Sequence, residues 1–475
     1  MSLGKSTKRG NLSRSIAVAT IIFAILFLAQ NLSSLSNRVV NKTTKINDYK
    51  LLSESLLGMN GKKNILILFM NNAEARYGGG FIGTVGYLSV DQGKITPEPI
   101  RSVYYYDYKY EAIGYLDKFA DPMEYEQYLN LRNSGRNLNG STNLERAKII
   151  FEKESGLGVD IVVAMTPEVL KYFLNQTGPV VLADYNLTIT SGNITEILQA
   201  EIEYGRDKIA GSDPKTILSS VANEILRRLS EKTLVELAEL ARGLKDLADQ
   251  RQILLFGTND DLAKSLENIK YDGSLVPFAG DYFVLAENNM SIDKSNGFID
   301  RQLERTASIR EDGSVSIGVK ITRTQTLEQS YPYIDPANGG YTFLIKPNKS
   351  FIKFAIPRGS KIDGNTTINQ EYKGIERGYD VYQFASELEP LKPSEYSFNY
   401  TLPFKLANTG VVDFNSYVQL QNGGWSYELT NNVLVPGSWQ LLASNKQDLL
   451  SLGNPVVYNK TIDRDVFLSL IYEAK

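Results

Sequence analysis

The chain predicts a mixed α/β sheet covered by helices, followed by a C-terminal β-sandwich and preceded by an N-terminal transmembrane helix. Three observations lead to this fold class. An apolar run with basic residues before it lies near the N-terminus, strand and helix patterns alternate up to about residue 290, and apolar residues alternate with polar ones after residue 300. At 475 residues, 42% of them hydrophobic, the chain can bury the cores of two or three domains.

The first element is the apolar run at residues 16–29, which follows the basic residues Lys5, Lys8, Arg9 and Arg14. This order is typical of a targeting segment. Leu32 and Leu35 extend the run toward the roughly 20 residues that a membrane-spanning helix needs. We therefore predict a cytoplasmic tail at 1–15 and an uncleaved anchor at 16–35. A cleaved signal peptide and a buried helix of a soluble domain are the alternatives.

Lys and Arg concentrate before the anchor, which predicts a single-pass protein of the cell membrane with the bulk of the chain outside the cytoplasm. A helical stalk is expected at 36–60, because leucines recur there at helical spacing up to Gly58.

An α/β domain is predicted at 61–299. Its strands are expected at 64–70, 81–90, 100–108, 159–165, 253–256 and 282–286. Thr142 and Glu145 form a capping box for a helix through about residue 154, and Pro167 opens the next helix. Further helices are expected at 213–229, 234–248 and 260–268.

Residues 300–475 are predicted to form the β-sandwich. Val315, Ile317, Val319 and Ile321 alternate with polar residues after a turn at Asp312-Gly313. Similar runs follow at 341–346, 350–356, 379–385, 396–402, 415–420 and 424–430. Short strands at this spacing are typical of a sandwich.

Composition excludes several classes of function. The formal net charge of −3 and a pI near 5.5 provide no broad basic field, so we expect no nucleic-acid partner. The chain has no cysteine and no histidine, which excludes disulfides, thiolate metal sites and Ser-His triads. Any catalysis would use carboxylates, Lys, Arg, Tyr, Ser or an oxygen-ligated metal such as Mg²⁺.

The most unusual stretch joins the first two expected strands. It contains the polar residues Asn71, Asn72, Glu74 and Arg76 and then the triple glycine Gly78, Gly79 and Gly80. Glycine permits positive φ and close approach of a ligand or a neighbouring chain. At a strand end of an α/β sheet, Arg76 is a candidate to bind phosphate or carboxylate, with the glycine amides forming an anion-binding concavity. In the alternative, Glu74 pairs with Arg76 and the asparagines close the turn.

Two further places carry candidate binding residues. Asp107 lies among tyrosines and is a candidate to bind metal or sugar, whereas the alternative is a tyrosine-rich strand with rings on both faces. Asn288, Asn289 and Lys294 follow the strand at 282–286. If that strand neighbours the first one, Lys294 and Arg76 face one cleft; otherwise this loop is a plain connection between domains.

These motifs together resemble the bacterial domain-of-unknown-function family 4012. The resemblance rests on Asn-Asn-x-Glu-x-Arg at 71–76 with Gly-Gly-Phe-Ile-Gly at 79–83, on the strand and Thr-Pro at 158–167 leading to Thr-Gly-Pro-Val at 177–180, and on Asn288-Asn289 with Lys-Ser-Asn at 294–296. It covers most of the chain and implies no chemistry. More distantly, the order of these pieces is similar to that in LytR-CpsA-Psr enzymes, which move glycan polymers from lipid pyrophosphate carriers onto the cell wall.

The distant resemblance implies a transferase in which Arg76, Arg206 and Lys294 neutralise phosphate and Asp107 acts in catalysis by holding Mg²⁺. The chain departs from that pattern, because residues 77–80 contain no acidic residue. Two functions therefore stay open. One is transfer of a glycan from a lipid-linked pyrophosphate, and the other is a non-catalytic surface binding or scaffold protein. Convergence of the four residues on one pocket would favour the first.

The anchor assignment makes a testable prediction. Protease added to intact spheroplasts should digest most of the chain, because residues beyond the anchor face outward. Full protection of the chain, or release of a soluble form that begins near Gln30, would contradict the assignment.

Overall fold

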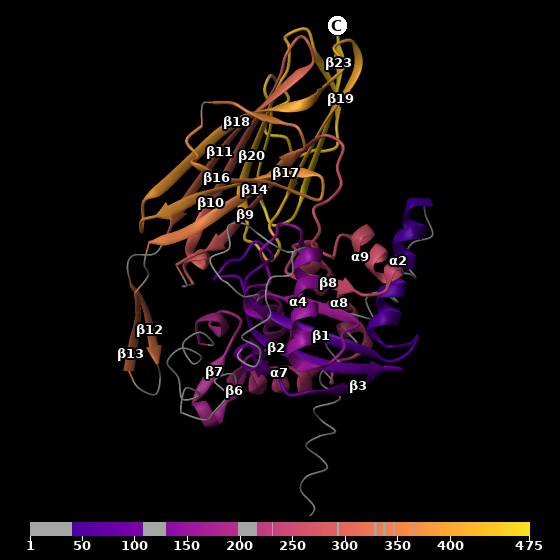
Figure 1. The fold of residues 1–475 in the computed structure, drawn as a ribbon, viewed down its shortest axis with the longest axis vertical. Helices are drawn as coiled ribbons and strands as arrows, with labels where there is room; N and C mark the ends of the chain where they lie inside the picture. Colours follow the sequence, from indigo (N-terminus) through magenta and orange to yellow (C-terminus); the bar gives the residue numbers. More distant parts are fainter. Residues whose placement is uncertain are drawn as a thin grey trace, which may run out of the picture.

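The structure is a computed structural model. It describes residues 40–107, 130–197, 216–229, 231–291, 294–326, 330–335, 339–344, 347–364 and 366–475. Figure 1 shows a helix-rich part, coloured indigo to pink, and an elongated part of orange and yellow strands that carries the C-terminus at its far end. We call them the α/β unit and the two-sheet unit.

The α/β unit is built on a six-stranded sheet of order β3-β2-β1-β5-β8, with β4 paired to β2. Its strands are β1 (Lys63–Asn71), β2 (Phe81–Asp91), β3 (Lys94–Pro97), β4 (Arg101–Ser102), β5 (Ile161–Met165) and β8 (Ile253–Gly257). Strand β1 runs parallel to β5 and antiparallel to β2. The predicted mixed α/β arrangement is therefore confirmed.

Helices cover both faces of this sheet. One face packs against α2 (Val40–Leu56), α5 (Pro167–Thr177), α7 (Thr216–Leu229), α8 (Leu234–Asp249) and α9 (Asp260–Ile269), and the other packs against α4 (Gly140–Ser155). Strand β1 is central, so Ile65 enters the first core while Leu66 and Leu68 enter the second. Burial on both faces explains why this strand is an almost unbroken apolar run. A small hairpin of β6 (Val180–Leu182) and β7 (Leu187–Ile189) lies in the same unit.

The two-sheet unit contains sheets of six and seven strands. The first has the order β15-β18-β11-β10-β20-β22 and the second β16-β17-β14-β9-β19-β23-β21. The strands of the first sheet are β10 (Ile299–Ile309), β11 (Ser314–Gln325), β15 (Lys361–Ile362), β18 (Pro393–Lys405), β20 (Tyr427–Leu434) and β22 (Val456–Ile462). Those of the second are β9 (Asp281–Asn289), β14 (Asn348–Pro357), β16 (Gln370–Glu376), β17 (Tyr379–Leu388), β19 (Gly410–Gln419), β21 (Gln440–Ser444) and β23 (Val466–Ala474).

The two sheets enclose one core. Leu303 and Ile317 of the first sheet and Phe354 and Phe384 of the second belong to the same buried cluster. Along β10 and β11, every second residue points into this core and the residues between point outward. This is the alternation of apolar and polar residues seen in the sequence. A separate hairpin pairs β12 (Ser330–Asp335) with β13 (Gly339–Leu344).

Strand β9 lies in a different sheet from the one that its sequence position suggested. It pairs with β14 and β19 and has no pairing with the sheet of the α/β unit. Its Phe283 and Leu285 enter the core between the two sheets, whereas Tyr282 and Val284 pack on the outer side against Tyr77 and its neighbours. Because both faces are buried, β9 has the continuous apolar pattern of an α/β strand.

The strand predicted at 100–108 is wrong over its described residues, 100–107. Strand β4 ends at Ser102, and Tyr104–Asp107 form a short helix, α3. Val103 and Tyr106 are buried, while Tyr104 and Tyr105 are exposed. Buried residues three apart suit a helical turn, whereas a strand would bury alternate residues.

The predicted capping box is also wrong. Helix α4 begins at Gly140 with Asn139 as its N-cap, so Thr142 and Glu145 lie inside the helix. The amide of Gly140 donates to the carbonyl oxygen of Gly273 at 2.9 Å. This bond satisfies the first amide of the helix, which begins two residues before Thr142. The helix ends at Ser155 before Gly156 at φ +73°, as predicted.

The predicted anchor at 16–35 lies outside the described residues. Within the part of the chain that the structure describes, every helix is too short or too polar to cross a membrane. Helix α2 lies within the expected stalk at 36–60, but it packs on α9 and is part of the α/β unit.

Another part of the same chain approaches the triple glycine closely. Gly423, in the loop between β19 and β20, has φ +60°, and a Cβ placed on it would lie 2.9 Å from the Cα of Gly79. Gly79 itself has φ +136°. The Nδ2 atom of Asn72 donates to the carbonyl oxygen of Gly423 at 3.0 Å. The close approach predicted from the glycines is thus made by the two-sheet unit.

This contact predicts a position-specific loss of stability. Gly423→Ala should lower the free energy of unfolding by about 1–3 kcal/mol, because a side chain there is strained and collides with the backbone of Gly79. Gly364→Ala is the control, since a Cβ at Gly364 meets open space. Chemical denaturation of both variants measures the difference. Equal midpoints would show that the two loops separate at little cost.

Candidate functional site

The loop at 71–80 lies where the two units meet. The backbone oxygen of Ala75 accepts a hydrogen bond from the amide of Asn289 at 2.9 Å, and that of Ala73 accepts from the amide of Asn296 at 3.1 Å. The third partner is the loop between β19 and β20, through Gly423. We call the meeting of these three segments the joint.

Glu74 connects two of the cations that the sequence singled out. It is 3% exposed. Its Oε1 accepts from Nη2 of Arg76 at 3.0 Å and its Oε2 from Nζ of Lys294 at 2.7 Å. Strands β1 and β9 are not sheet neighbours, yet the loops that follow them bring Arg76 and Lys294 together. The Glu74–Arg76 pair that was the alternative interpretation is present in the structure.

Two amides of the triple glycine take part in internal hydrogen bonds. The amide of Gly78 donates to the carbonyl oxygen of Gly135 at 3.0 Å, and that of Gly79 donates to the carbonyl oxygen of Arg76 at 2.9 Å. All three glycines are buried. In this arrangement Gly78 and Gly79 hold the loop against its neighbours, and Asn71 closes the turn by accepting from the amide of Ala73.

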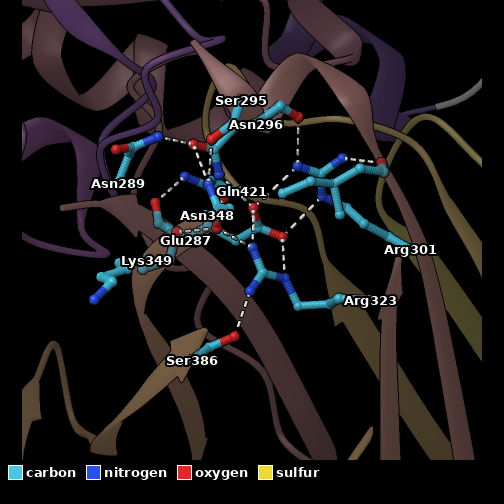
Figure 2. Close-up of polar contacts among 12 residues, drawn as sticks. Glu287, Asn289, Ser295, Asn296, Arg301, Arg323, Asn348, Lys349, Ser386 and Gln421 are labelled. Carbon is cyan, nitrogen blue, oxygen red and sulfur yellow. Dashed lines mark hydrogen bonds and ion pairs between the residues drawn. The ribbon is translucent and has the colours of Figure 1, made fainter. Parts of the chain in front are cut away.

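A buried carboxylate lies beside the joint, as Figure 2 shows. Glu287, near the end of β9, is 2% exposed. Arg301 donates from Nε to Oε1 at 2.8 Å and from Nη2 to Oε2 at 2.9 Å. Arg323 adds a contact from Nε to Oε1 at 3.2 Å, and Nδ2 of Asn296 donates to Oε2 at 2.8 Å. The carboxylate is therefore held by two arginines and an amide.

These partners decide the ionisation of Glu287. Burial disfavours its charged form, but the charges and hydrogen bonds of Arg301 and Arg323 outweigh burial and hold the pKa of Glu287 well below its usual range. Glu287 thus stays ionised at physiological pH. A carboxylate held in this way is unsuited to accept and return protons.

Hydrogen bonds connect this network to the loop at 71–80. The Nε2 atom of Gln421 donates both to the backbone oxygen of Glu287 at 2.9 Å and to that of Arg76 at 2.8 Å. Asn289 donates from Nδ2 to Oδ1 of Asn296 at 2.6 Å (Figure 2). Lys294, Asn289 and the residues around Arg76 therefore form one polar assembly.

A second buried ion pair joins the units further along the contact. Arg251, which follows α8, is 2% exposed. Its Nη2 donates to Oδ2 of Asp465 at 2.7 Å and its Nη1 donates to Oδ1 of Asn422 at 3.0 Å. The contact between the units thus combines packed aromatic side chains with paired charges.

Asp107 lies on α3 and is bound by a neighbouring turn, η2 (Leu131–Asn133). Its Oδ1 accepts from the amide of Leu131 at 2.8 Å and its Oδ2 accepts from Nη1 of Arg132 at 2.8 Å. Burial raises the pKa of Asp107, and these two donors oppose the rise. Asn133 of the same turn accepts at Oδ1 from Nε of Arg76 at 3.1 Å, so Asp107 and Arg76 are linked through this turn.

The donor set around Asp107 does not fit the magnesium role. Both carboxylate oxygens already accept strong donors, and an arginine partner opposes a cation. Among the described residues, no group of three or more acidic side chains is arranged to hold a metal. No step is therefore assigned to Mg²⁺ here.

Sequence reasoning missed Glu154 on α4. It is 1% exposed, and its Oε2 has no hydrogen-bond partner. Burial, followed by the nearby charge of Asp107, raises its pKa to about 8. The signal was its spacing, because Ala147, Ile150 and Phe151 of the same helix are buried and Glu154 continues that face.

Three arginines lie against aromatic rings at the edge of this region. The Cζ atom of Arg76 is 5.6 Å from the ring centroid of Phe81, that of Arg132 is 5.6 Å from Tyr104, and that of Arg101 is 4.3 Å from Tyr105. The rings of Phe81 and Tyr104 lie 6.4 Å apart. Tyr104 and Tyr105 are 38% and 52% exposed. We call these six residues the arginine–aromatic ledge.

The site residues predicted from the sequence do not all lie together in the structure. The structure brings Arg76, Asp107 and Lys294 into one region, with Asn72, Glu74 and the glycines inside the joint. Arg206 lies outside the described residues. A polar hollow of about 270 Å³ lies elsewhere, on the outer face of the sheet that contains β10, β11 and β20. Its lining includes Gln302, Glu304, Lys320, Thr322, Glu428 and Thr430.

The fold and the joint define a two-unit protein with an α/β part and a strand-rich part. The family described as "Protein of unknown function (DUF4012)" matches residues 60–202. This match includes the motif at 71–83 and confirms the resemblance seen there. The more distant resemblance to the LytR-CpsA-Psr enzymes is not confirmed.

No curated protein matches the chain. Among solved structures it is similar to protein gbs0355 from Streptococcus agalactiae, with 13% identity over 46% of this chain and 75% of that one, at a TM-score of 0.28. Lin1025 from Listeria innocua has 13% identity over 44% and 79%, at a TM-score of 0.25. An M1 zinc metallopeptidase from Deinococcus radiodurans has 14% identity over 37% and 42%, at 0.19. Similarities of this size support no argument about fold or function.

The Glu287 network predicts a large and pH-dependent effect. Glu287→Gln should lower the free energy of unfolding by about 3–5 kcal/mol, because two buried arginines lose their counter-charge. Since the pKa of Glu287 is lowered on folding, its contribution is present above the unfolded value near 4.5 and is lost as pH falls below it. The variant should therefore lose less stability than the parent on acidification.

Glu387→Gln is the control, because its ion pair with Lys349 is exposed and should contribute about 0–1 kcal/mol. Denaturant unfolding at pH 7 and at pH 4 measures both variants. A Glu287→Gln variant as stable as the control would show that this pair is not essential to the joint.

Proposed function

We propose that this chain is a membrane-anchored, extracytoplasmic protein of the cell envelope that binds a glycan or a lipid-linked glycan precursor without catalysing its transfer. The predicted anchor at 16–35 would hold it at the membrane. The two-sheet unit, which we interpret as a β-sandwich, would hold the α/β unit in a fixed relation through the joint.

One observation carries the non-catalytic part of this proposal. The candidate carboxylates are each paired with cations, namely Glu74 with Arg76 and Lys294, Asp107 with Arg132, and Glu287 with Arg301 and Arg323. A general base needs an oxygen that can reach a substrate proton. These carboxylates instead hold segments of the protein together.

Glu154 is the exception, because its pKa near 8 would suit acid–base chemistry. It is nevertheless 1% exposed, so a substrate does not reach it in this arrangement. None of these four buried carboxylates is therefore an accessible acid or base for glycan transfer, and binding is the better supported function.

The glycan part of the proposal rests on the surface beside the joint. Exposed tyrosines can pack on the apolar faces of sugar rings, and arginines can hold the charged groups of an anionic glycan. The structure offers both side-chain types on one side of the α/β unit, at the strand ends where α/β sheets bind ligands.

The test separates binding from transfer. The full chain in detergent is incubated with a polyprenyl-pyrophosphate-linked oligosaccharide, a glycan acceptor and Mg²⁺, and both binding and product are measured. We expect saturable binding and no transferred glycan. Product that disappears in Asp107→Asn would establish the enzyme instead, and absence of binding to the donor and to isolated envelope glycan would reject the proposal.

A further inference from the structure

We propose that the arginine–aromatic ledge is a binding site for a sugar that carries a phosphate group, with Arg101 and Tyr105 as its main contacts. This inference rests on the proposed glycan binding and specifies where the ligand lies and which chemistry it has. The shared chemistry is a phosphate attached to a sugar, whether that sugar is soluble or linked to a lipid.

The ledge brings together residues from segments far apart in sequence. Phe81 begins β2, Tyr104 and Tyr105 belong to α3, and Arg132 belongs to η2. The contact of 6.4 Å between the rings of Phe81 and Tyr104 joins two of the three arginine–ring pairs. Tyr105 is the next residue along the helix and carries the third arginine on its ring. The fold therefore places three arginine–ring pairs on α3 and the segments next to it.

The geometry suits a phosphate more than a neutral sugar. When a guanidinium group stacks on a ring, its N–H groups lie in the guanidinium plane and stay available at the edge of that plane. Two of these N–H groups can bind two oxygens of one phosphate. Arg101 lies 4.3 Å from the ring of Tyr105, which is the shortest of the three distances. Tyr105 is 52% exposed, so its ring can also meet an apolar sugar face.

The charge of the region also favours an anion. Arg76, Arg101, Arg132 and Lys294 provide four cations, and the carboxylates among them lie underneath, with side-chain exposures of 4% for Glu74 and 0% for Asp107. Burial keeps the pKa of Glu154 at about 8, so it is mostly uncharged at pH 7. Glu98 is exposed nearby and is the negative group that a bound anion would have to avoid. Arg76, Arg132 and Lys294 have side-chain exposures of 11%, 22% and 18% and pair with these carboxylates, so Arg101 is the cation that a ligand would chiefly meet.

Substitutions at Arg101 and Tyr105 can test ligand binding without disturbing the fold. Arg76 and Arg132 hold Glu74 and Asp107 in the core, so their loss would disturb the fold. Arg101 is half-buried and stacks on an exposed ring, and Tyr105 lies largely in solvent. Arg101→Gln and Tyr105→Ala should therefore leave the melting temperature nearly unchanged.

The experiment measures calorimetric binding of glucose 1-phosphate, inorganic phosphate and glucose to the full chain in detergent. Glucose 1-phosphate should bind more tightly than phosphate, and glucose should not bind measurably. Loss of a charge-assisted contact in Arg101→Gln should weaken binding roughly ten- to a hundredfold. Arg101→Lys should also weaken it, because a lysine keeps the charge and loses the two-point geometry. Tyr105→Ala should weaken it about three- to tenfold.

Arg227→Gln is the control, since Arg227 is an exposed arginine of α7 that pairs with Glu224 and Glu231. A second arm uses vesicles with and without a polyprenyl pyrophosphate sugar, and preference for those vesicles over the soluble sugar phosphate identifies a lipid-linked ligand. Binding that is equal in the parent and in all three ledge variants overturns this site while leaving glycan binding intact. Equal affinity for glucose and glucose 1-phosphate overturns the phosphate assignment.

Discussion

The pairing of Glu287 with Arg301 and Arg323 joins β9, β10 and β11 within the two-sheet unit, and it fixes the end of β9 to which the loop at 71–80 is hydrogen-bonded. Transferring a carboxylate and two guanidinium groups from water into a protein interior is costly, and only close pairing with additional hydrogen bonds offsets that cost. Glu287 meets this condition because β10 and β11 present their arginines to the end of β9. Its backbone then binds Gln421, which also holds Arg76. Through Gln421 and the amide of Asn289, the end of β9 that this network holds is hydrogen-bonded to the loop at 71–80.

The joint changes the meaning of the most unusual motif in the chain. Its polar residues and glycines resemble a ligand-binding loop, yet Asn72 and Glu74 contact other parts of the protein, and Gly79 accommodates the backbone around Gly423. A motif of this kind acts by bringing two units into a fixed relation. The surface left for a ligand lies beside it, where arginines stack on the rings of Phe81, Tyr104 and Tyr105.

Sequence patterns predicted most strands and helices because each depends on local spacing. The alternation from Val315 to Ile321 and the apolar run of β1 both reflect burial of defined faces. The same reasoning failed at Tyr104, where a run of tyrosines suited a strand but two of them remain in solvent. It also missed Glu154, because a charged residue near a helix end usually faces solvent.

The sequence by itself determined the α/β pattern, the strand-rich C-terminal part, the absence of cysteine and histidine chemistry, and the match of residues 60–202 to a family of unknown function. Only the tertiary structure decided that β9 joins the seven-stranded sheet, that Lys294 and Arg76 share Glu74, and that Gly423 lies against Gly79. The physical reason is the range of the interactions. Periodicity records which face of a segment is buried, whereas the identity of the covering partner depends on contacts between residues hundreds of positions apart.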